Sequence, residues 1–236
     1  MLEPQNEVER LKTVYQQYRY NETIQRQWSG DNPGNRYILN ERTRWVHYIL
    51  KSNKKIPLTP FKILDVGCGS GNVLAGYLQW GACPENLFGI DLIPERIENA
   101  KHAFPELHFQ VANAEQIEFP TAFFDLVTVF TVFTSILDDQ MAAHVAEEID
   151  RVLKPAGAVI WYDFRYNNPR NPHVRGMSRS KIQLLFPRYD LQLKSITLLP
   201  PLTRRFGKLT PYLYPLLNTV PFLRTHYLGL LIKPGA

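Results

Sequence analysis

Cysteine is scarce in this chain, and its arrangement suits neither cross-linking nor metal binding. Only Cys68 and Cys83 occur among 236 residues, with no CxxC pair and no histidine at metal-ligand spacing. We therefore expect neither a disulfide framework nor a metal site, which is typical of a reducing compartment. The start of the chain, MLEPQNEVERLK, is acidic and polar rather than basic and apolar. It predicts no secretory signal, and a cytoplasmic location is expected.

A hydrophobic run long enough to cross a membrane is also missing. The most apolar late segment, Pro211 to Leu223, has 13 residues and is interrupted by Pro215 and Asn218, whereas a span needs roughly 20. The sequence thus excludes a span here. It leaves open a peripheral contact with a membrane surface through residues 200–224.

Acidic residues are nearly absent from the C-terminal third. Residues 164–236 contain 12 lysines and arginines and one acid, Asp190, whereas residues 1–163 contain 15 basic and 21 acidic side chains. A modest overall charge of +5 therefore combines an acidic body with a strongly basic C-terminal section. This asymmetry predicts an acceptor or carrier that is anionic.

Short apolar runs alternate with amphipathic stretches of helical length from residue 61 onward. This alternation predicts an α/β fold with a mostly parallel sheet that is buried on both faces. The expected strands are Phe61–Val66, Leu87–Asp91, His108–Ala112, Phe124–Thr131, Ala158–Phe164, Leu191–Leu199 and Thr225–Ile232, and the expected helices are Asn72–Trp80, Pro94–Phe104, Asp138–Leu153 and Ser178–Phe186. The last strand is expected to run antiparallel, as an interrupted hairpin with the sixth.

The chain before the sheet reads as two helices separated by a break at Ser29 to Asn35. We expect residues 1–56 to form an N-terminal helical cap, and a helical or irregular insertion at about residues 200–224. The cap is rich in aromatic side chains. These either anchor the helices on the sheet or close over a ligand, and the sequence leaves both possibilities open.

A strand that runs into a glycine turn, ILDVGCGSGN at residues 63–72, is the strongest local signal. Glycines 67, 69 and 71 permit positive φ and a close approach of backbone to ligand. The lysine of a phosphate-binding P-loop is missing, and the spacing is GxGxG rather than the GxGxxG of dinucleotide sites. Asp65, two residues before the turn, suits an ammonium group, and Asp91, at the end of the next strand, suits the hydroxyls of a ribose. These two acids favour S-adenosylmethionine over a dinucleotide.

The chain resembles the class I S-adenosylmethionine-dependent methyltransferases over residues 60–165. The motifs that carry this resemblance are LDVGCGSG (64–71), GIDLIPERIENAK (89–101), VANAEQIEF (111–119), FDLVTVF (124–130) and RVLKPAGAVIW (151–161). The late part of the chain is similar to a bacterial subgroup of small-molecule and glycan-pathway type. Position 113 is often Asp in the family, and glycine is usual where Ala156 stands, a departure that we expect to be harmless.

The resemblance implies a Rossmann-like seven-stranded sheet of order 3-2-1-4-5-7-6, with strand 7 antiparallel and helices on both faces. It assigns residues 57–236 to an S-adenosylmethionine-binding methyltransferase domain. Methyl transfer from this cofactor would leave S-adenosylhomocysteine as product. The cofactor-binding residues that it implies are Asp65, Gly67, Cys68, Gly69, Gly71, Asp91, Leu92, Asn113, Ala114, Glu115 and Phe130.

The acceptor is expected above the carboxyl ends of strands four and five. The Asn/Asp-Pro-Pro-Tyr/Phe motif of enzymes that methylate adenine or glutamine amino groups does not follow strand four, and a run of hydrogen-bonding and aromatic side chains, residues 161–173, ends strand five. We therefore predict a small-molecule acceptor that is O-methylated on a hydroxyl, of glycan-type, lipid-linked or natural-product kind. Asp163 and His173 are the candidate catalytic bases.

Two other functions stay open at this stage. The basic C-terminal section would also suit an RNA methyltransferase. It would equally suit a membrane-peripheral protein that binds the cofactor without turnover, with residues 200–224 lying on anionic lipid. A third interpretation makes this segment a lid over the acceptor site.

Overall fold

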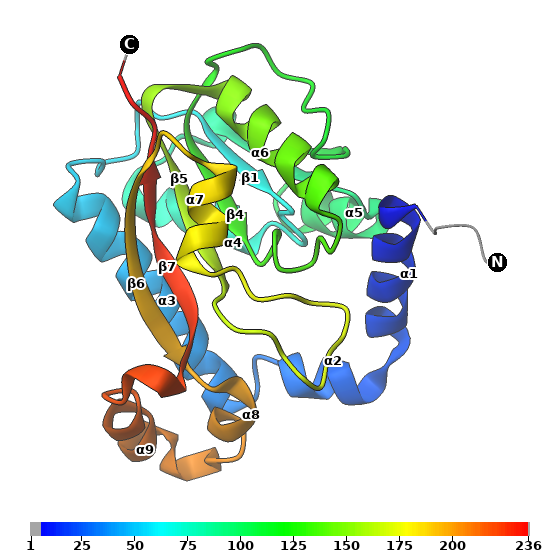
Figure 1. Cartoon of the computed structure of the whole chain (residues 1–236), viewed down its shortest axis with the longest axis vertical. Helices are drawn as coiled ribbons and strands as arrows, with labels where there is room; N and C mark the ends of the chain where they lie inside the picture. Colours follow the sequence, from blue (N-terminus) through cyan, green and yellow to red (C-terminus); the bar gives the residue numbers. More distant parts are fainter. Residues whose placement is uncertain (1–5, 236) are drawn as a thin grey trace.

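The computed structural model describes residues 6–235, and its centre is one seven-stranded sheet (Figure 1). The strand order β3-β2-β1-β4-β5-β7-β6 confirms the predicted order. β1 to β5 pair in parallel, and β7 is antiparallel to both β5 and β6, which confirms the antiparallel last strand. The strands are β1 (Ile63–Val66), β2 (Leu87–Asp91), β3 (His108–Val111), β4 (Phe124–Phe130), β5 (Leu153–Phe164), β6 (Asp190–Leu198) and β7 (Arg224–Ile232).

Helices cover both faces of this sheet because alternate strand residues are apolar on opposite sides. Leu64 and Val66 of β1 point to one face, where α6 and α7 pack, and Ile63 points to the other, where α3, α4 and α5 pack. The α-helices are α1 (Glu7–Tyr20), α2 (Glu22–Trp28), α3 (Pro33–Ser52), α4 (Asn72–Gly76), α5 (Pro94–Ala103), α6 (Asp139–Val152), α7 (Arg179–Leu185), α8 (Pro200–Thr203) and α9 (Thr210–Leu217). The 3-10 turns are η1 (Tyr77–Trp80), η2 (Pro84–Asn86), η3 (Gly207–Leu209) and η4 (Pro221–Leu223).

The N-terminal region contains three helices, so the prediction of two is wrong. Asn21 has extended backbone angles that end α1, and its side chain accepts a hydrogen bond from Ile24 N at the start of α2. Asn32 caps α3 in the same way, accepting from Gly34 N. Asparagine favours such caps because its side chain replaces the missing helical acceptor. Of the expected cap at residues 1–56, residues 1–5 lie outside the described part.

The strand after α6 begins earlier than the expected Ala158–Phe164. Asp138 caps α6, accepting from Met141 N at 2.7 Å. β5 begins at Leu153, directly after the helix, and includes Lys154 to Gly157. Ala156 adopts a φ of 60° there, a left-handed conformation that glycine adopts at lower cost.

The segment between β6 and β7 folds as α8, η3, α9 and η4 beyond one end of the sheet, at the bottom of Figure 1. A buried carboxylate on α3, Glu41, joins it to the sheet. It accepts hydrogen bonds from Thr197 N of β6, from the hydroxyl of Tyr214 and from the amide of Asn218. Between residues 6 and 235, no helix combines the length and hydropathy needed to cross a bilayer.

Candidate active site

A cavity of about 1530 Å³ opens at the carboxyl ends of the parallel strands. Gly67, Asp91, Thr131 and Phe164, at or just beyond the ends of β1, β2, β4 and β5, line its floor. α1 to α3, the loop 165–174 and α8 contribute much of the walls, and that loop crosses the front of the view in Figure 1. The volume exceeds the roughly 300–1000 Å³ of a site for one small ligand. The cavity is therefore large enough for two molecules side by side.

The glycine turn shapes the first half of this cavity. Gly67, Gly69 and Gly71 have φ of 70°, 55° and 79°, a region in which side chains are strained. A Cβ at Gly71 would lie 2.6 Å from the ring of Phe109. Gly67 N donates to Ile90 O at 2.8 Å, which ties the turn to β2. Of the three glycines only Gly67 lines the cavity, so the other two set the shape of the turn.

Asp91 joins the turn to the end of β2. Its carboxylate accepts hydrogen bonds from Gly69 N and Ile93 N, both at 2.9 Å, and Arg96 Nη1 lies 3.7 Å from Oδ2. The side chain is 5% exposed and lines the cavity. It therefore presents a fixed acceptor at the cavity wall.

A third group of predicted residues lies beside Asp91. Asn113 Oδ1 accepts from Glu115 N, and Asn113 Nδ2 donates to Glu115 Oε2 at 3.0 Å. Glu115 does not line the cavity in this structure, and its contacts hold the Asn113 side chain in place. The predicted residues that do line the cavity are Gly67, Asp91, Leu92, Asn113, Ala114 and Phe130.

Asp65 and Cys68 lie behind the cavity wall. Burial raises the pKa of Asp65 to about 8, although Arg42 opposes the shift. An ammonium group brought close would lower this pKa again. Burial also raises the pKa of the Cys68 thiol, helped by the nearby Asp65 and Asp91, so that this thiol stays protonated and unreactive.

The two predicted bases occupy different environments. Asp163 is 1% exposed and does not line the cavity. Its carboxylate accepts from Thr134 N at 2.9 Å and Phe164 N at 2.8 Å, and burial raises its pKa to about 7. β5 thus places the Asp163 side chain beneath the loop that follows β4, and its role as a base stays a prediction.

His173, in contrast, lines the cavity from the loop 165–174. Its backbone N–H donates to Asn171 Oδ1, and the amide of Asn171 donates to the hydroxyl of Tyr18 on α1 at 2.9 Å. Tyr15 of the same helix lies 2.9 Å from Ser135 Oγ and beneath the guanidinium of Arg96. Tyr15 and Tyr18 both line the cavity. Both hydroxyls therefore join α1 to the loops around the cavity, while both side chains also face the space inside it.

Three of the cavity residues that the sequence did not identify as site residues carry a side chain able to hold charge at the acceptor side. Arg42 extends from α3, Arg204 follows α8, and His226 lies in β7. Arg42 and Arg204 have no local motif, and no sequence signal marks them. His226 stands in the late part of the chain that is similar to the bacterial subgroup, which alone could have marked it.

Comparisons with known proteins agree with this geometry. Residues 64–161 match the family model described as a methyltransferase domain. A phthiotriol/phenolphthiotriol dimycocerosates methyltransferase of Mycobacterium leprae is 30% identical over 136 residues, which are 57% of this chain and 49% of that protein. A tRNA N(3)-cytidine methyltransferase of Gallus gallus is 27% identical over 117 residues, 45% of this chain and 31% of that protein. The chain therefore spans half or less of the length of these curated relatives.

The fold has many solved counterparts. The N-methyltransferase NodS of Bradyrhizobium japonicum superimposes with a TM-score of 0.61 at 17% identity, covering 87% of this chain and 99% of that one. At such identity the likeness concerns the fold alone. It agrees with the observed strand order.

Proposed function

We propose that the chain methylates a small molecule, on the premise that residues 64–161 form a class I S-adenosylmethionine-dependent methyltransferase domain. The cofactor of this domain is S-adenosylmethionine. One observation carries this proposal. One cavity is lined on one side by Gly67, Asp91 and Asn113 of the cofactor motifs and on the other by the polar loop 165–174. Cofactor and acceptor would meet in it.

The half of the cavity that is lined by Gly67, Asp91 and Asn113, here called the cofactor half, suits S-adenosylmethionine. The half on the side of the loop 165–174 is called the acceptor half. Asp91 would accept hydrogen bonds from the ribose hydroxyls, Asn113 would face the adenine amino group, and Leu92 and Phe130 would supply apolar contacts. Gly67 would let the backbone approach the amino-acid end, with Asp65 behind it. S-adenosylmethionine supplies an activated methyl group, so that the protein mainly aligns the acceptor and excludes water.

We propose that the acceptor atom is a hydroxyl oxygen of a glycan-type, lipid-linked or natural-product molecule. The relative from Mycobacterium leprae, named as a phthiotriol/phenolphthiotriol dimycocerosates methyltransferase, supports a small-molecule acceptor. The oxygen forms a bond to the methyl carbon as the methyl–sulfur bond breaks and its electron pair stays on sulfur. A hydroxyl gives up its proton in this step, so a base helps the transfer.

His173 is the base that we propose, because it is the predicted base that lines the cavity. Asp163 would be a positioning residue, because its carboxylate fixes Thr134 N and Phe164 N beneath the loops. Replacing His173 by glutamine is expected to lower the rate of methyl transfer by about 100-fold and to leave the affinity for S-adenosylhomocysteine unchanged.

The His173 prediction is tested by single-turnover transfer of labelled methyl groups across pH. A matched control is His102→Gln, an exposed side chain on α5. Equal rates and equal pH profiles for the wild type and His173→Gln would remove His173 from the reaction.

The function itself is tested with a labelled methyl group on S-adenosylmethionine and cell extract separated into small-molecule, lipid and RNA fractions. We expect label in the small-molecule or lipid fraction, and none with Asp91→Ala. Label in RNA would favour the RNA methyltransferase alternative. The relative from Gallus gallus, named as a tRNA N(3)-cytidine methyltransferase, is the reason to test this fraction. Cofactor binding without transfer to any fraction would favour a binding protein without turnover.

We also propose that residues 200–224 contact an anionic membrane surface. Leu209, Tyr212, Leu216 and Phe222 are 59%, 75%, 65% and 72% exposed, and residues 191–235 contain no acidic side chain. Phe222 also lines the cavity. A lipid-linked acceptor would thus meet the cavity at the surface that touches the bilayer.

Replacing Leu216 and Phe222 together by serine is expected to reduce binding to phosphatidylserine-containing vesicles by at least about tenfold, because each apolar side chain inserted contributes about 1.5–3 kcal/mol. Flotation with such vesicles, and with phosphatidylcholine alone, measures this. Leu184→Ser on α7, where the side chain is 80% exposed, is the control. Wild-type protein that does not float with either vesicle would exclude the membrane contact and leave the lid interpretation.

A further inference from the structure

Positive charge dominates the wall of the cavity. Among its lining residues within 6–235, Asp91 is the one acid, and Arg96 lies beside it. Five further arginines line the cavity. In the described part of the chain, only Arg26 of these five lies within ion-pair distance of a carboxylate, which belongs to Glu22. The four others are Arg42, Arg170, Arg204 and Arg205. A cavity with this balance attracts anions.

Arg42 is held in place by aromatic rings rather than by an acid. Its guanidinium carbon lies 4.8 Å from the ring centre of Phe130 and 5.3 Å from that of Tyr162. Both rings line the cavity at the ends of β4 and β5. Stacking of this kind fixes a guanidinium while leaving its N–H groups available to a ligand.

Arg204 reaches the same region from α8. Its Nε donates to Asn35 Oδ1 at 2.8 Å, and its carbonyl oxygen accepts from the amide of Asn32. α3 and α8 approach closely here, since a Cβ at Gly34 would lie 2.5 Å from Thr203 O. Burial lowers the pKa of Arg204, so that this cation is held partly desolvated, at a cost that a bound anion would offset.

His226 lies beside one of the rings that hold Arg42, and Arg204 lines the same cavity. The His226 ring is stacked on that of Tyr162, with centres 4.6 Å apart and planes at 4°. Burial lowers the pKa of His226 to about 3, and the charges of Arg42 and Arg204 lower it further. The imidazole therefore stays neutral. The positive charge of this region comes from the guanidinium groups alone.

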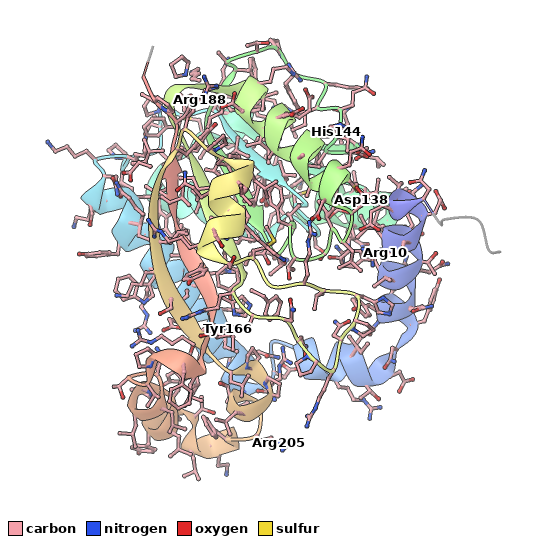
Figure 2. The ribbon with its side chains drawn as sticks, in the orientation of Figure 1. Arg10, Asp138, His144, Tyr166, Arg188 and Arg205 are labelled. Carbon is pink, nitrogen blue, oxygen red and sulfur yellow. The ribbon has the colours of Figure 1, made fainter. Side chains whose placement is uncertain are left out.

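We propose that Arg42 and Arg204 form an oxyanion-binding subsite where the acceptor half of the cavity meets Phe130 of the cofactor half, and that this subsite holds a phosphate group carried by the acceptor. This inference rests on the proposed function, since it names the chemical class of the molecule to be methylated. Two guanidinium groups match a dianion in charge, and their planar N–H groups match phosphate oxygens in geometry. Arg170 and Arg205, both exposed, stand at the rim and would draw the anion inward. Arg205 is at the lower end of the molecule in Figure 2.

The experiment is calorimetric titration of the full chain, saturated with S-adenosylhomocysteine, with inorganic phosphate. We expect binding by the wild type and about a tenfold or greater loss of affinity in both Arg42→Gln and Arg204→Gln, since each removes charge-assisted hydrogen bonds. Arg188→Gln is the matched control, because Arg188 is exposed outside the cavity and at the far end of the molecule (Figure 2). It should bind phosphate like the wild type.

Further titrations with glycerol phosphate and with vesicles containing phosphatidic acid distinguish a soluble phosphate ester from a lipid headgroup. Equal phosphate affinity in all variants, or no binding by the wild type, would overturn the subsite. The affinity for S-adenosylhomocysteine is measured first on each protein, so that failure of the phosphate subsite can be distinguished from failure of the proposed function. If the wild type does not bind S-adenosylhomocysteine, the proposed function fails whatever the phosphate titration shows.

Discussion

Replacing Asp91 by alanine is expected to lower the affinity for S-adenosylmethionine and S-adenosylhomocysteine by at least about 100-fold, because hydrogen bonds to a charged group contribute about 1.5–3 kcal/mol each. The carboxylate has two tasks in the structure. It lies at the cavity wall, and it accepts hydrogen bonds from Gly69 N and Ile93 N. Alanine would remove the acceptor for the ribose and also one of the hydrogen bonds that tie the glycine turn to β2. Calorimetric titration with both ligands measures the loss.

Asp91→Asn separates these two tasks. Its amide keeps the size of the side chain and one acceptor oxygen, so we expect an intermediate loss of about tenfold and a smaller change in thermal stability than in Asp91→Ala. Asp190→Ala, at an exposed site at the start of β6, controls for the loss of one negative charge. Native affinity in Asp91→Ala would show that the ribose is bound elsewhere.

The sheet and the cofactor half of the cavity could be predicted because their signals are local. Each strand is a short apolar run, and the glycine turn lies within ten residues of the strand that positions it. The ends of parallel strands meet at one edge, so Asp91, Asn113 and Phe130 had to converge there once the strands were placed. The strand order is confirmed, and residues 64–161 match the family model of a methyltransferase domain.

The acceptor half depends on packing between distant segments, which no local pattern encodes. Arg42 looks like a solvent-facing residue of an amphipathic helix, and Arg204 looks like part of a basic run in a loop. Only the contact of α3 with α8 brings them to one cavity. Asp163 illustrates the opposite case. Its place at the end of β5 predicts exposure to a ligand, but the loop after β4 folds over it and binds its carboxylate.

The second large effect is expected from Glu41, a buried carboxylate on α3 that is 5% exposed. Thr197 N donates to its Oε2 at 3.0 Å, the Tyr214 hydroxyl donates to the same oxygen at 2.5 Å, and Asn218 Nδ2 donates to Oε1 at 2.6 Å. Glu41→Ala would leave all three donors without this acceptor inside the protein. We expect the free energy of unfolding in urea to fall by about 3 kcal/mol or more.

The effect of Glu41→Ala should concentrate in the segment between β6 and β7, because two of the three donors lie in or next to α9. Limited proteolysis within residues 200–223 should therefore accelerate more than cleavage elsewhere. Glu98→Ala, an exposed site on α5, should change neither measurement. Thr197 also connects Glu41 to the cavity, since its carbonyl accepts from Thr225 Oγ1, which in turn contacts His226 Nδ1. If Glu41→Ala is as stable as the wild type and equally resistant to protease, then apolar packing rather than this carboxylate holds the segment on the sheet.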